Sequence, residues 1–151
     1  MNPTPARVLP PLVLGLAAEL VRTIDEGVRA RGFDDLRPAH GFAFVRLAPD
    51  GATVGELADH LGVTKQAASQ MVEELVRKGY VERRAHPTDA RARLVVLTGR
   101  GHACTRAADE AAADAVRPWA EALGGPALDR LTADLATLAA LGPGGRLRPV
   151  W

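Results

Sequence analysis

Four arginines lie close together in the segment RRAHPTDARAR, residues 83–93, on either side of a Pro-Thr-Asp sequence. They are Arg83, Arg84, Arg91 and Arg93. A guanidinium group is planar and always charged, so it suits phosphate oxygens and other strongly negative surfaces. The Pro-Thr-Asp sequence favours a turn, and the β-branched and apolar residues beyond it favour a strand. The segment therefore predicts an arginine-bearing β-hairpin that binds a polyanion.

A second group of polar residues precedes the hairpin, on a helix predicted to begin after Thr64 as its N-cap. Four side chains lie opposite the apolar face of its first two turns: Lys65, Gln66, Ser69 and Gln70. Gln can bond an adenine edge with two hydrogen bonds, Lys can reach guanine or a phosphate, and a helix N-terminus can hold a phosphate. The alternative is an ordinary solvated face. Because no acidic residue lies between 64 and 72, contact with DNA is the favoured hypothesis.

The charge distribution agrees with this hypothesis. The whole chain has a net charge of +1, but residues 64–100 carry 8 basic and 4 acidic side chains. Residues 1–63 carry 6 basic and 8 acidic side chains, and residues 101–151 carry 5 and 6. Positive charge confined to the middle of a chain is typical of a polyanion-binding surface. Ion pairs are expected later on the same helix, between Glu73 and Arg77 and between Glu74 and Lys78.

A short helix before Thr64 completes a recognisable arrangement. Thr53 and Glu56 have the spacing of a capping box, and Gly62 supplies the residue that ends the helix. Two helices joined by this turn and followed by the hairpin predict a winged helix-turn-helix, so the fold class is mainly α with a small β part (α+β). The apolar run Leu94–Leu97 predicts a strand end that is buried on both faces.

Helices are expected on both sides of this domain. Pro10 and Pro11 suit the first turn of one helix, and Pro38 suits the first turn of a second that ends at Pro49. An Ala-rich helix after residue 101 should be kinked or broken at Pro118. The last helix repeats leucines at the spacing of a helix–helix contact, which requires a partner surface: Leu128, Leu131, Leu135 and Leu138.

The chain is therefore divided by sequence into a disordered tail, a DNA-binding domain, dimerisation helices and a C-terminal tail. The expected ranges are 1–9 for the tail, 36–100 for the winged helix-turn-helix, 10–33 plus 101–141 for the flanking helices, and 142–151 for the end.

The segment TVGELADHLGVTKQAASQMVEELVRKGYVERR, the Asp-Ala-Arg of the hairpin loop and LVVLTGRG resemble the MarR (multiple antibiotic resistance regulator) family of winged-helix repressors. The resemblance implies a homodimer that binds an inverted-repeat operator, with repression as the expected effect. It also implies that Arg91 enters the minor groove while Asp89 holds its guanidinium, and that Arg84 and Arg93 flank it on phosphates. Arg83 is expected to pair inside the domain.

Alternatives to these roles stay open. Asp89 and Arg91 would contribute only about 0–1 kcal/mol as a plain surface ion pair, and Arg93 would serve equally well as a solvated residue. The winged domain would alternatively serve as a protein-interaction module without DNA specificity of its own.

The resemblance further implies that a small phenolic or other aromatic effector binds between the dimer helices and the winged domain and releases the DNA. Four residues are candidates to line that site: His40, Phe42, Phe44 and Trp119. At helical spacing such residues are more often part of the core.

Other classes of function lack support in the sequence. No nucleophile–base pattern, phosphate-binding Gly-rich loop or zinc motif is present, so the protein is not expected to be an enzyme or to need a cofactor or metal. Cys104 is the single cysteine, which excludes an internal disulfide and suits a reducing cytoplasm; a small buried side chain is favoured over a redox role. No signal peptide or membrane span is expected.

Overall fold

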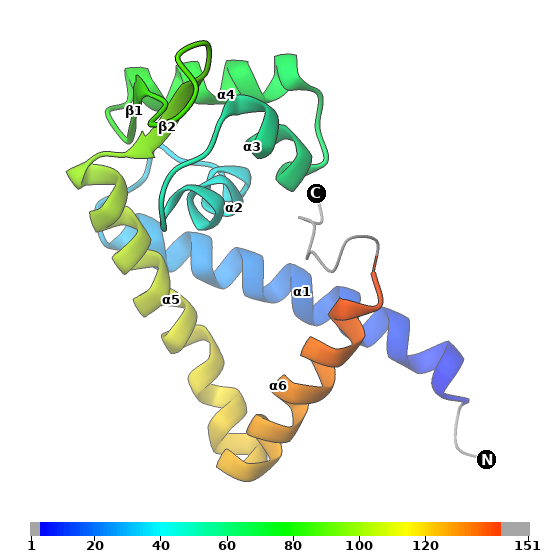
Figure 1. The fold of residues 1–151 in the computed structure, drawn as a ribbon. Helices are drawn as coiled ribbons and strands as arrows, with labels where there is room; N and C mark the ends of the chain where they lie inside the picture. The colour runs from blue at the N-terminus through cyan, green and yellow to red at the C-terminus, as the bar shows by residue number, and fades with distance from the viewer. Residues whose placement is uncertain (1–3, 143–151) are drawn as a thin grey trace.

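The computed structural model describes residues 4–142. Within that range the chain forms a winged domain above three long helices, as Figure 1 shows. The elements are α1 (Pro5–Ala30), α2 (Pro38–Leu47), α3 (Val54–Leu61), α4 (Lys65–Arg77), β1 (Val81–Ala85), β2 (Arg93–Leu97), α5 (Gly99–Leu123) and α6 (Gly125–Ala140). The predicted fold class, a mainly helical winged helix-turn-helix with flanking helices, is confirmed.

Local capping defines the helix-turn-helix. The Thr53 hydroxyl accepts from the Glu56 N–H at 3.2 Å, and the Glu56 carboxylate accepts from the Thr53 N–H at 2.9 Å. Gly62 ends α3 with φ +68°, a left-handed conformation that glycine adopts at little cost. The Thr64 hydroxyl then accepts from the Ala67 N–H at 3.1 Å and begins α4. The capping box, the turn and the second N-cap predicted from sequence are confirmed.

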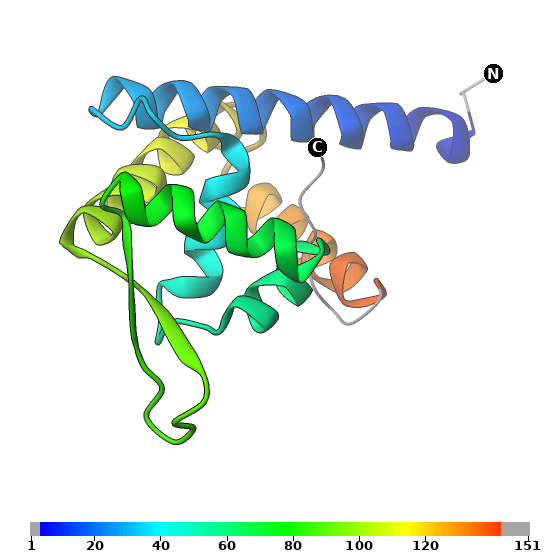
Figure 2. The same cartoon turned by 90° about the horizontal axis from the view of Figure 1, so that it is seen from above.

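The strands β1 and β2 form the predicted hairpin, which projects from the domain as a wing in Figure 2. They pair antiparallel from Val81 opposite Leu97 to Ala85 opposite Arg93, and Ala52 adds an isolated bridge to Val95. Burial on both faces of the run Leu94–Leu97 is wrong in part. Val95 and Leu97 are buried, but Leu94 and Val96 on the other face are only half-buried, because no helix covers that side.

The core lies under the wing and extends to the long helices. Side chains from α2, α3, α4 and the sheet form its centre, and α1 and α5 contribute residues at its lower edge. The largest fully buried side chains are Tyr80, Leu47, Leu57, Leu75, His40, Val72, Val81 and Val95. The winged domain is therefore packed onto the crossing of α1 and α5 rather than joined to it by a free linker.

The helices α1 and α5 approach closely at that crossing. A Cβ atom added at Gly27 would lie 2.7 Å from the Cβ of Ala111, so only glycine allows this approach. Arg31 reinforces it by binding Glu110 at 3.1 Å and Asp114 at 2.7 Å. By contrast, α6 packs against α5 and has no buried residue in this chain.

The predicted place of Pro10 and Pro11 is wrong, and the predicted break at Pro118 does not occur. The helix α1 begins at Pro5, so residues 5–9 are helical rather than a disordered tail, and Pro10 and Pro11 lie inside it. Because proline has no backbone N–H, the carbonyls of Ala6 and Arg7 receive no hydrogen bond from the residue four positions later. Pro118 likewise neither breaks nor ends α5, which continues to Leu123. Residues 1–3 and 143–151, which include most of the predicted C-terminal tail, lie outside the described residues.

The junction between wing and α5 depends on one threonine and one glycine. The Thr98 hydroxyl caps α5 by accepting from the Gly101 N–H at 3.2 Å, and it donates to the Gly79 carbonyl at 2.6 Å. A Cβ at Gly101 would lie 2.2 Å from the Tyr80 carbonyl oxygen. The backbone of α5 therefore lies against Tyr80, the residue directly before β1.

This contact predicts that Gly101→Ala lowers the free energy of unfolding by about 1–3 kcal/mol, as overpacking does. Gly99→Ala is the matched control, because nothing lies within 4 Å of a Cβ at that position and α5 begins there. Chemical denaturation of both variants measures the effect. Equal stability of the two would contradict the account of this junction.

Candidate nucleic-acid interface

The first two turns of α4 present an uncovered polar face. Ala68, Val72 and Leu75 are buried and fix which side of the helix faces inward. On the other side Thr64, Lys65, Gln66 and Gln70 are exposed and Ser69 is half-buried. The first N–H groups of a helix lack intrahelical partners and carry partial positive charge. This end of α4 can therefore hold a phosphate next to side chains with the hydrogen-bonding groups that base edges require.

Ion pairs on α4 lie away from that face. Glu74 accepts from Lys78 at 2.9 Å and from Arg37 at 2.7 Å, and the hydrogen bond from Lys78 lowers its pKa to about 2. The predicted Glu73–Arg77 pair is wrong, since no such pair occurs among residues 4–142 and both side chains are exposed. Glu74 thus attaches α4 to the start of α2 and leaves the first two turns free.

The loop of the wing is held by two side chains. His86 Nδ1 accepts from the N–H groups of Thr88 at 3.2 Å and Asp89 at 3.1 Å. The Asp89 carboxylate accepts from the Arg91 backbone N–H at 2.9 Å. The predicted contact of Asp89 with the Arg91 guanidinium is therefore wrong: Asp89 fixes the backbone and leaves the guanidinium exposed. His86 was not among the predicted site residues, although its place before Pro-Thr-Asp marked it as part of the turn.

The four arginines of the wing differ in their partners. Arg84 binds Glu82 at 2.5 Å, whereas Arg83, Arg91 and Arg93 are exposed and form no ion pair within residues 4–142. The prediction that Arg83 pairs inside the domain is wrong. The strand register places Arg83 opposite Val95, on the hairpin face that Arg93 shares. Arg83 and Arg93 are thus free cations on one face, and Arg84 is partly neutralised on the other.

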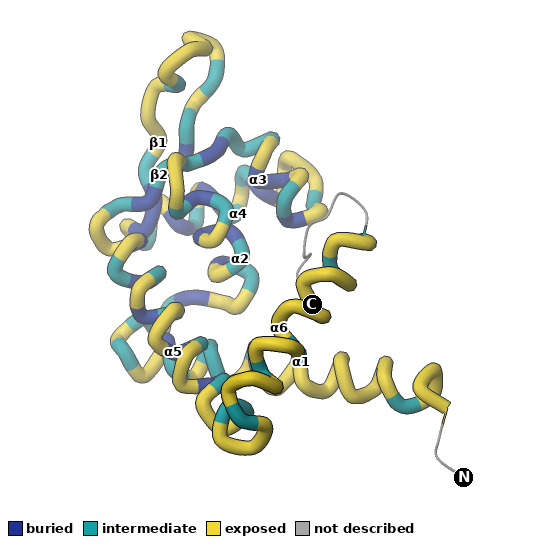
Figure 3. The backbone as a smooth tube through the Cα atoms, turned by 60° about the horizontal axis from the view of Figure 1, so that its bottom comes forward, coloured by how far each residue is buried: buried dark blue, intermediate teal, exposed yellow. Residues whose placement is uncertain are grey.

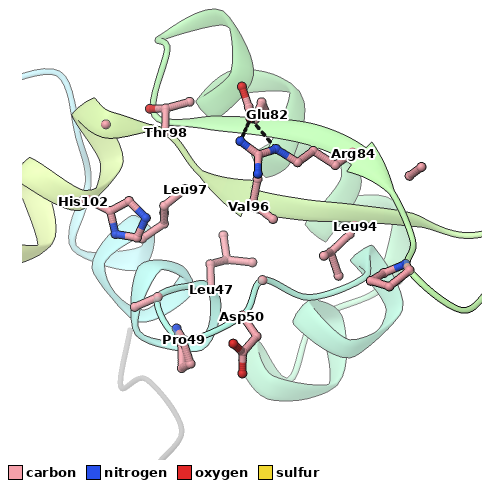
Figure 4. A pocket seen from close by; sticks show the side chains of 15 residues that line it. Leu47, Pro49, Asp50, Glu82, Arg84, Leu94, Val96, Leu97, Thr98 and His102 are labelled. Atoms are coloured by element: carbon pink, nitrogen blue, oxygen red, sulfur yellow. Dashed lines mark hydrogen bonds and ion pairs between the residues drawn. The ribbon is translucent and has the colours of Figure 1, made fainter.

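A shallow groove of about 650 Å³ lies behind the wing, on the face that carries the Glu82–Arg84 pair (Figure 4). Leu47, Leu94 and Val96 form its apolar floor, and Asp50 and His102 lie at its rim. Because this groove is open to solvent, the face of β2 that carries Leu94 and Val96 is only half-buried. Arg84 points along this face toward Glu82, so it reaches a phosphate only if that ion pair opens.

Tyr80 connects the wing to the long helices. It is fully buried, and its ring centroid lies 5.7 Å from that of Phe44 and 6.3 Å from that of Phe33. Its hydroxyl donates to Asp35 at 2.5 Å and accepts from Arg100 at 3.0 Å. The Arg100 guanidinium lies 4.4 Å from the ring centroid and also binds Asp35 at 3.3 Å. Burial raises the pKa of Tyr80 to about 12, so the hydroxyl stays protonated.

A second cavity, of about 260 Å³, lies between α1, α2 and α5. Of the predicted effector-binding residues, Phe42 and Phe44 line it, and His40 and Trp119 do not. His40 is instead a fully buried core residue whose Nδ1 accepts from the Arg37 N–H at 3.0 Å. Burial lowers the pKa of His40, so its ring is neutral. Trp119 is half-buried near the end of α5.

Cys104 also lines this cavity and is buried. Burial raises the pKa of its thiol to about 11, which keeps it protonated and unreactive. Among residues 4–142 no three His, Cys, Asp or Glu side chains are grouped to hold a metal ion. No helix in the described range is long and apolar enough to span a membrane.

Residues 42–92, which include α3, α4, the wing loop and most of α2, match the sequence model of the MarR family. This part of the chain therefore resembles the MarR family in sequence. A comparison with curated protein sequences gives no match. A MarR transcriptional regulator from Methanosarcina mazei Go1 has the same fold, with TM-score 0.75 and 20% identity, covering 90% of this chain and 96% of its own.

Several solved structures share this fold over most of the chain. RV1404 from Mycobacterium tuberculosis aligns with TM-score 0.76 and 22% identity, covering 99% of this chain and 100% of its own. Apo MarR from E. coli aligns with TM-score 0.69 and 25% identity over 86% and 95%. A mutant of that MarR complexed with operator DNA gives 0.70 and 23% over 91% and 99%. CouR from Rhodococcus jostii RHA1, bound to p-coumaroyl-CoA, gives 0.74 and 20% over 93% and 95%.

The Tyr80 contacts predict the effect of removing one hydroxyl from this chain. Tyr80→Phe keeps the ring packing but loses two hydrogen bonds to charged groups, so the free energy of unfolding should fall by about 1–3 kcal/mol at pH 7.

The pH dependence of the stability difference between the wild type and Tyr80→Phe shows whether the Tyr80 hydroxyl is its cause. An acid with a raised pKa in the folded state contributes stability below its unfolded pKa, about 10 for tyrosine, and loses it as pH rises through the folded value, about 12. Denaturant titrations between pH 7 and 12 should therefore show the variant and the wild type converging above pH 10. A constant difference across that range would contradict the assignment.

Proposed function

We propose that this MarR-family chain is a homodimeric regulator that binds an inverted-repeat operator and represses transcription until a small ligand binds. The observation that carries the proposal is the set of donors left without protein partners. They run from the start of α4 to the wing, while the neighbouring acidic groups are engaged elsewhere. The DNA complex of the E. coli relative supports the same class of partner.

In this proposal α4 lies in a major groove. Gln66 and Gln70, four residues apart on its exposed face, read base edges, and Lys65 bonds guanine or a phosphate. Thr64 caps the helix with its oxygen, which leaves its hydroxyl hydrogen for a phosphate, and Ser69 completes the surface.

The wing serves the adjacent minor groove. Arg91 enters it, because the loop is held through backbone N–H groups and the guanidinium is free. Arg93 binds a flanking phosphate together with Arg83, which replaces the inward-facing role expected for it. Asp89 acts as the residue that shapes the loop, and Arg84 contributes after release from Glu82.

A second copy of the chain covers the apolar surface of α1 and α6. Five large apolar side chains of the first half of α1 are exposed: Leu9, Leu12, Val13, Leu14 and Leu16. On α6, Leu135 and Leu138 are 44% and 57% exposed. Figure 3 shows both helices exposed along most of their length. An apolar surface of this extent in a monomer indicates a protein interface. A two-fold dimer then explains an inverted repeat with half-sites about one helical turn apart.

An effector site in the cavity between α1, α2 and α5 fits the same proposal. The cavity touches Leu36 and Arg37, which directly follow Asp35, and Phe44, which packs on Tyr80. A ligand that separates these elements shifts the winged domain relative to α1 and α5. The complex of CouR with p-coumaroyl-CoA supports a small-molecule effector.

Binding to DNA from immediately upstream of the chain's own gene tests the proposal. Arg91→Ala should weaken binding by about 1–3 kcal/mol per half-site in a fluorescence-anisotropy titration, while the circular dichroism spectrum stays that of the wild type. Arg106→Ala on α5, also exposed and unpaired within the described residues, is the control and should leave affinity unchanged. If the wild-type protein does not bind this DNA but binds a protein partner through the wing, the result supports the protein-interaction alternative.

The dimer has its own test. Leu135→Asp together with Leu138→Asp should produce monomers in sedimentation velocity, because two charges cannot be buried in the proposed interface without partners. Val76→Asp on α4, a 37% exposed apolar position outside the interface, should leave the dimer intact. A double variant that sediments as the wild type does would remove α6 from the interface.

A further inference from the structure

The chemistry of the cavity between α1, α2 and α5 restricts the kind of molecule that it can hold. Most of its lining is apolar: Val21, Ile24, Val28, Leu36, Phe42 and Phe44 contribute side chains. At about 260 Å³ it suits one small ring system. The neighbouring Cys104 is protonated, because burial raises its pKa to about 11, so it adds no charge.

Three charged residues line the cavity, and two of them already have partners. Asp25 accepts from Arg29 at 2.8 Å, and Arg37 donates to Glu74 at 2.7 Å. Asp109 is exposed and forms no ion pair within residues 4–142. The charge that the lining leaves uncompensated is therefore negative.

The two carboxylates come from the two long helices. Asp25 belongs to α1 and Asp109 to α5, and both line the cavity. Arg37 belongs to the start of α2 and is directed to Glu74 on α4.

We propose that the effector of this chain is a hydrophobic amine whose apolar body fills the cavity and whose ammonium group lies beside Asp109. This inference rests on the effector site of the proposed function and names its ligand class. An aromatic carboxylate of the same size would meet Asp109 with like charge. It would gain a cation only by taking Arg37 from Glu74. An ammonium group gains attraction at the same place without breaking any ion pair.

A pair of probes of matched shape and opposite charge tests the inference. Isothermal titration of the full chain at pH 7 with 2-naphthylmethylamine and with 2-naphthoic acid compares the two charges on one ring system. The amine should bind about tenfold more tightly than the acid, because the ammonium group is attracted to Asp109 and the carboxylate is repelled by it.

Two variants test whether Asp109 causes the preference for the amine. Asp109→Asn should reduce the ratio of the two affinities severalfold. Asp59→Asn, which removes an exposed negative charge on α3 away from the cavity, should leave the ratio unchanged. Thermal unfolding of both variants checks that each is folded. A ratio that stays the same in Asp109→Asn would contradict the assignment to this carboxylate.

The outcomes separate this inference from the proposed function. Tighter binding of the acid overturns the ligand class but keeps an effector site in the cavity. Failure of both probes to bind overturns the inference and the effector site together. Operator binding is measured without either probe, so it tests DNA recognition independently of the ligand.

Discussion

Tyr80 lies where α4 ends, the wing begins and the long helices meet, and its buried hydroxyl must be satisfied by groups from elsewhere in the chain. Asp35 and Arg100 satisfy it, and they belong to the segment before α2 and to the first turn of α5. A buried hydroxyl without these partners would cost free energy, so the three segments keep one relative position. The wing and α4 therefore form a single surface whose orientation is set by α1 and α5.

That constraint explains how a nearly neutral protein can present a cationic edge. Acidic groups near the interface are used internally: Glu74 holds Lys78 and Arg37, Glu82 holds Arg84, and Asp89 shapes the wing loop. The cations at the start of α4 and on one face of the wing are left without partners. The same connection would carry the proposed effect of a ligand to the proposed DNA-binding surface, since the ligand cavity borders the segment that carries Asp35.

Local features were predictable from sequence, and long-range contacts were not. The capping box at Thr53, the N-cap at Thr64 and the hairpin depend on residues a few positions apart, so their spacing identifies them. The contact of Asp35 with Tyr80 joins residues 45 apart, and no local pattern predicts it. The error at Arg83 has the same origin, because only the strand register shows which face it occupies. Pro118 shows that a local penalty can be outweighed when the rest of a helix is well packed.

The salt dependence of operator affinity tests the central claim most directly. Lys65, Arg83, Arg91 and Arg93 form no ion pair within residues 4–142, so the proposed dimer, with two copies of this edge against duplex DNA, would release many counterions. A plot of log affinity against log salt concentration should then have a slope between about −3 and −7. A slope near zero, for DNA that the protein does bind, would contradict the account, because the cationic edge would then not be the surface in contact.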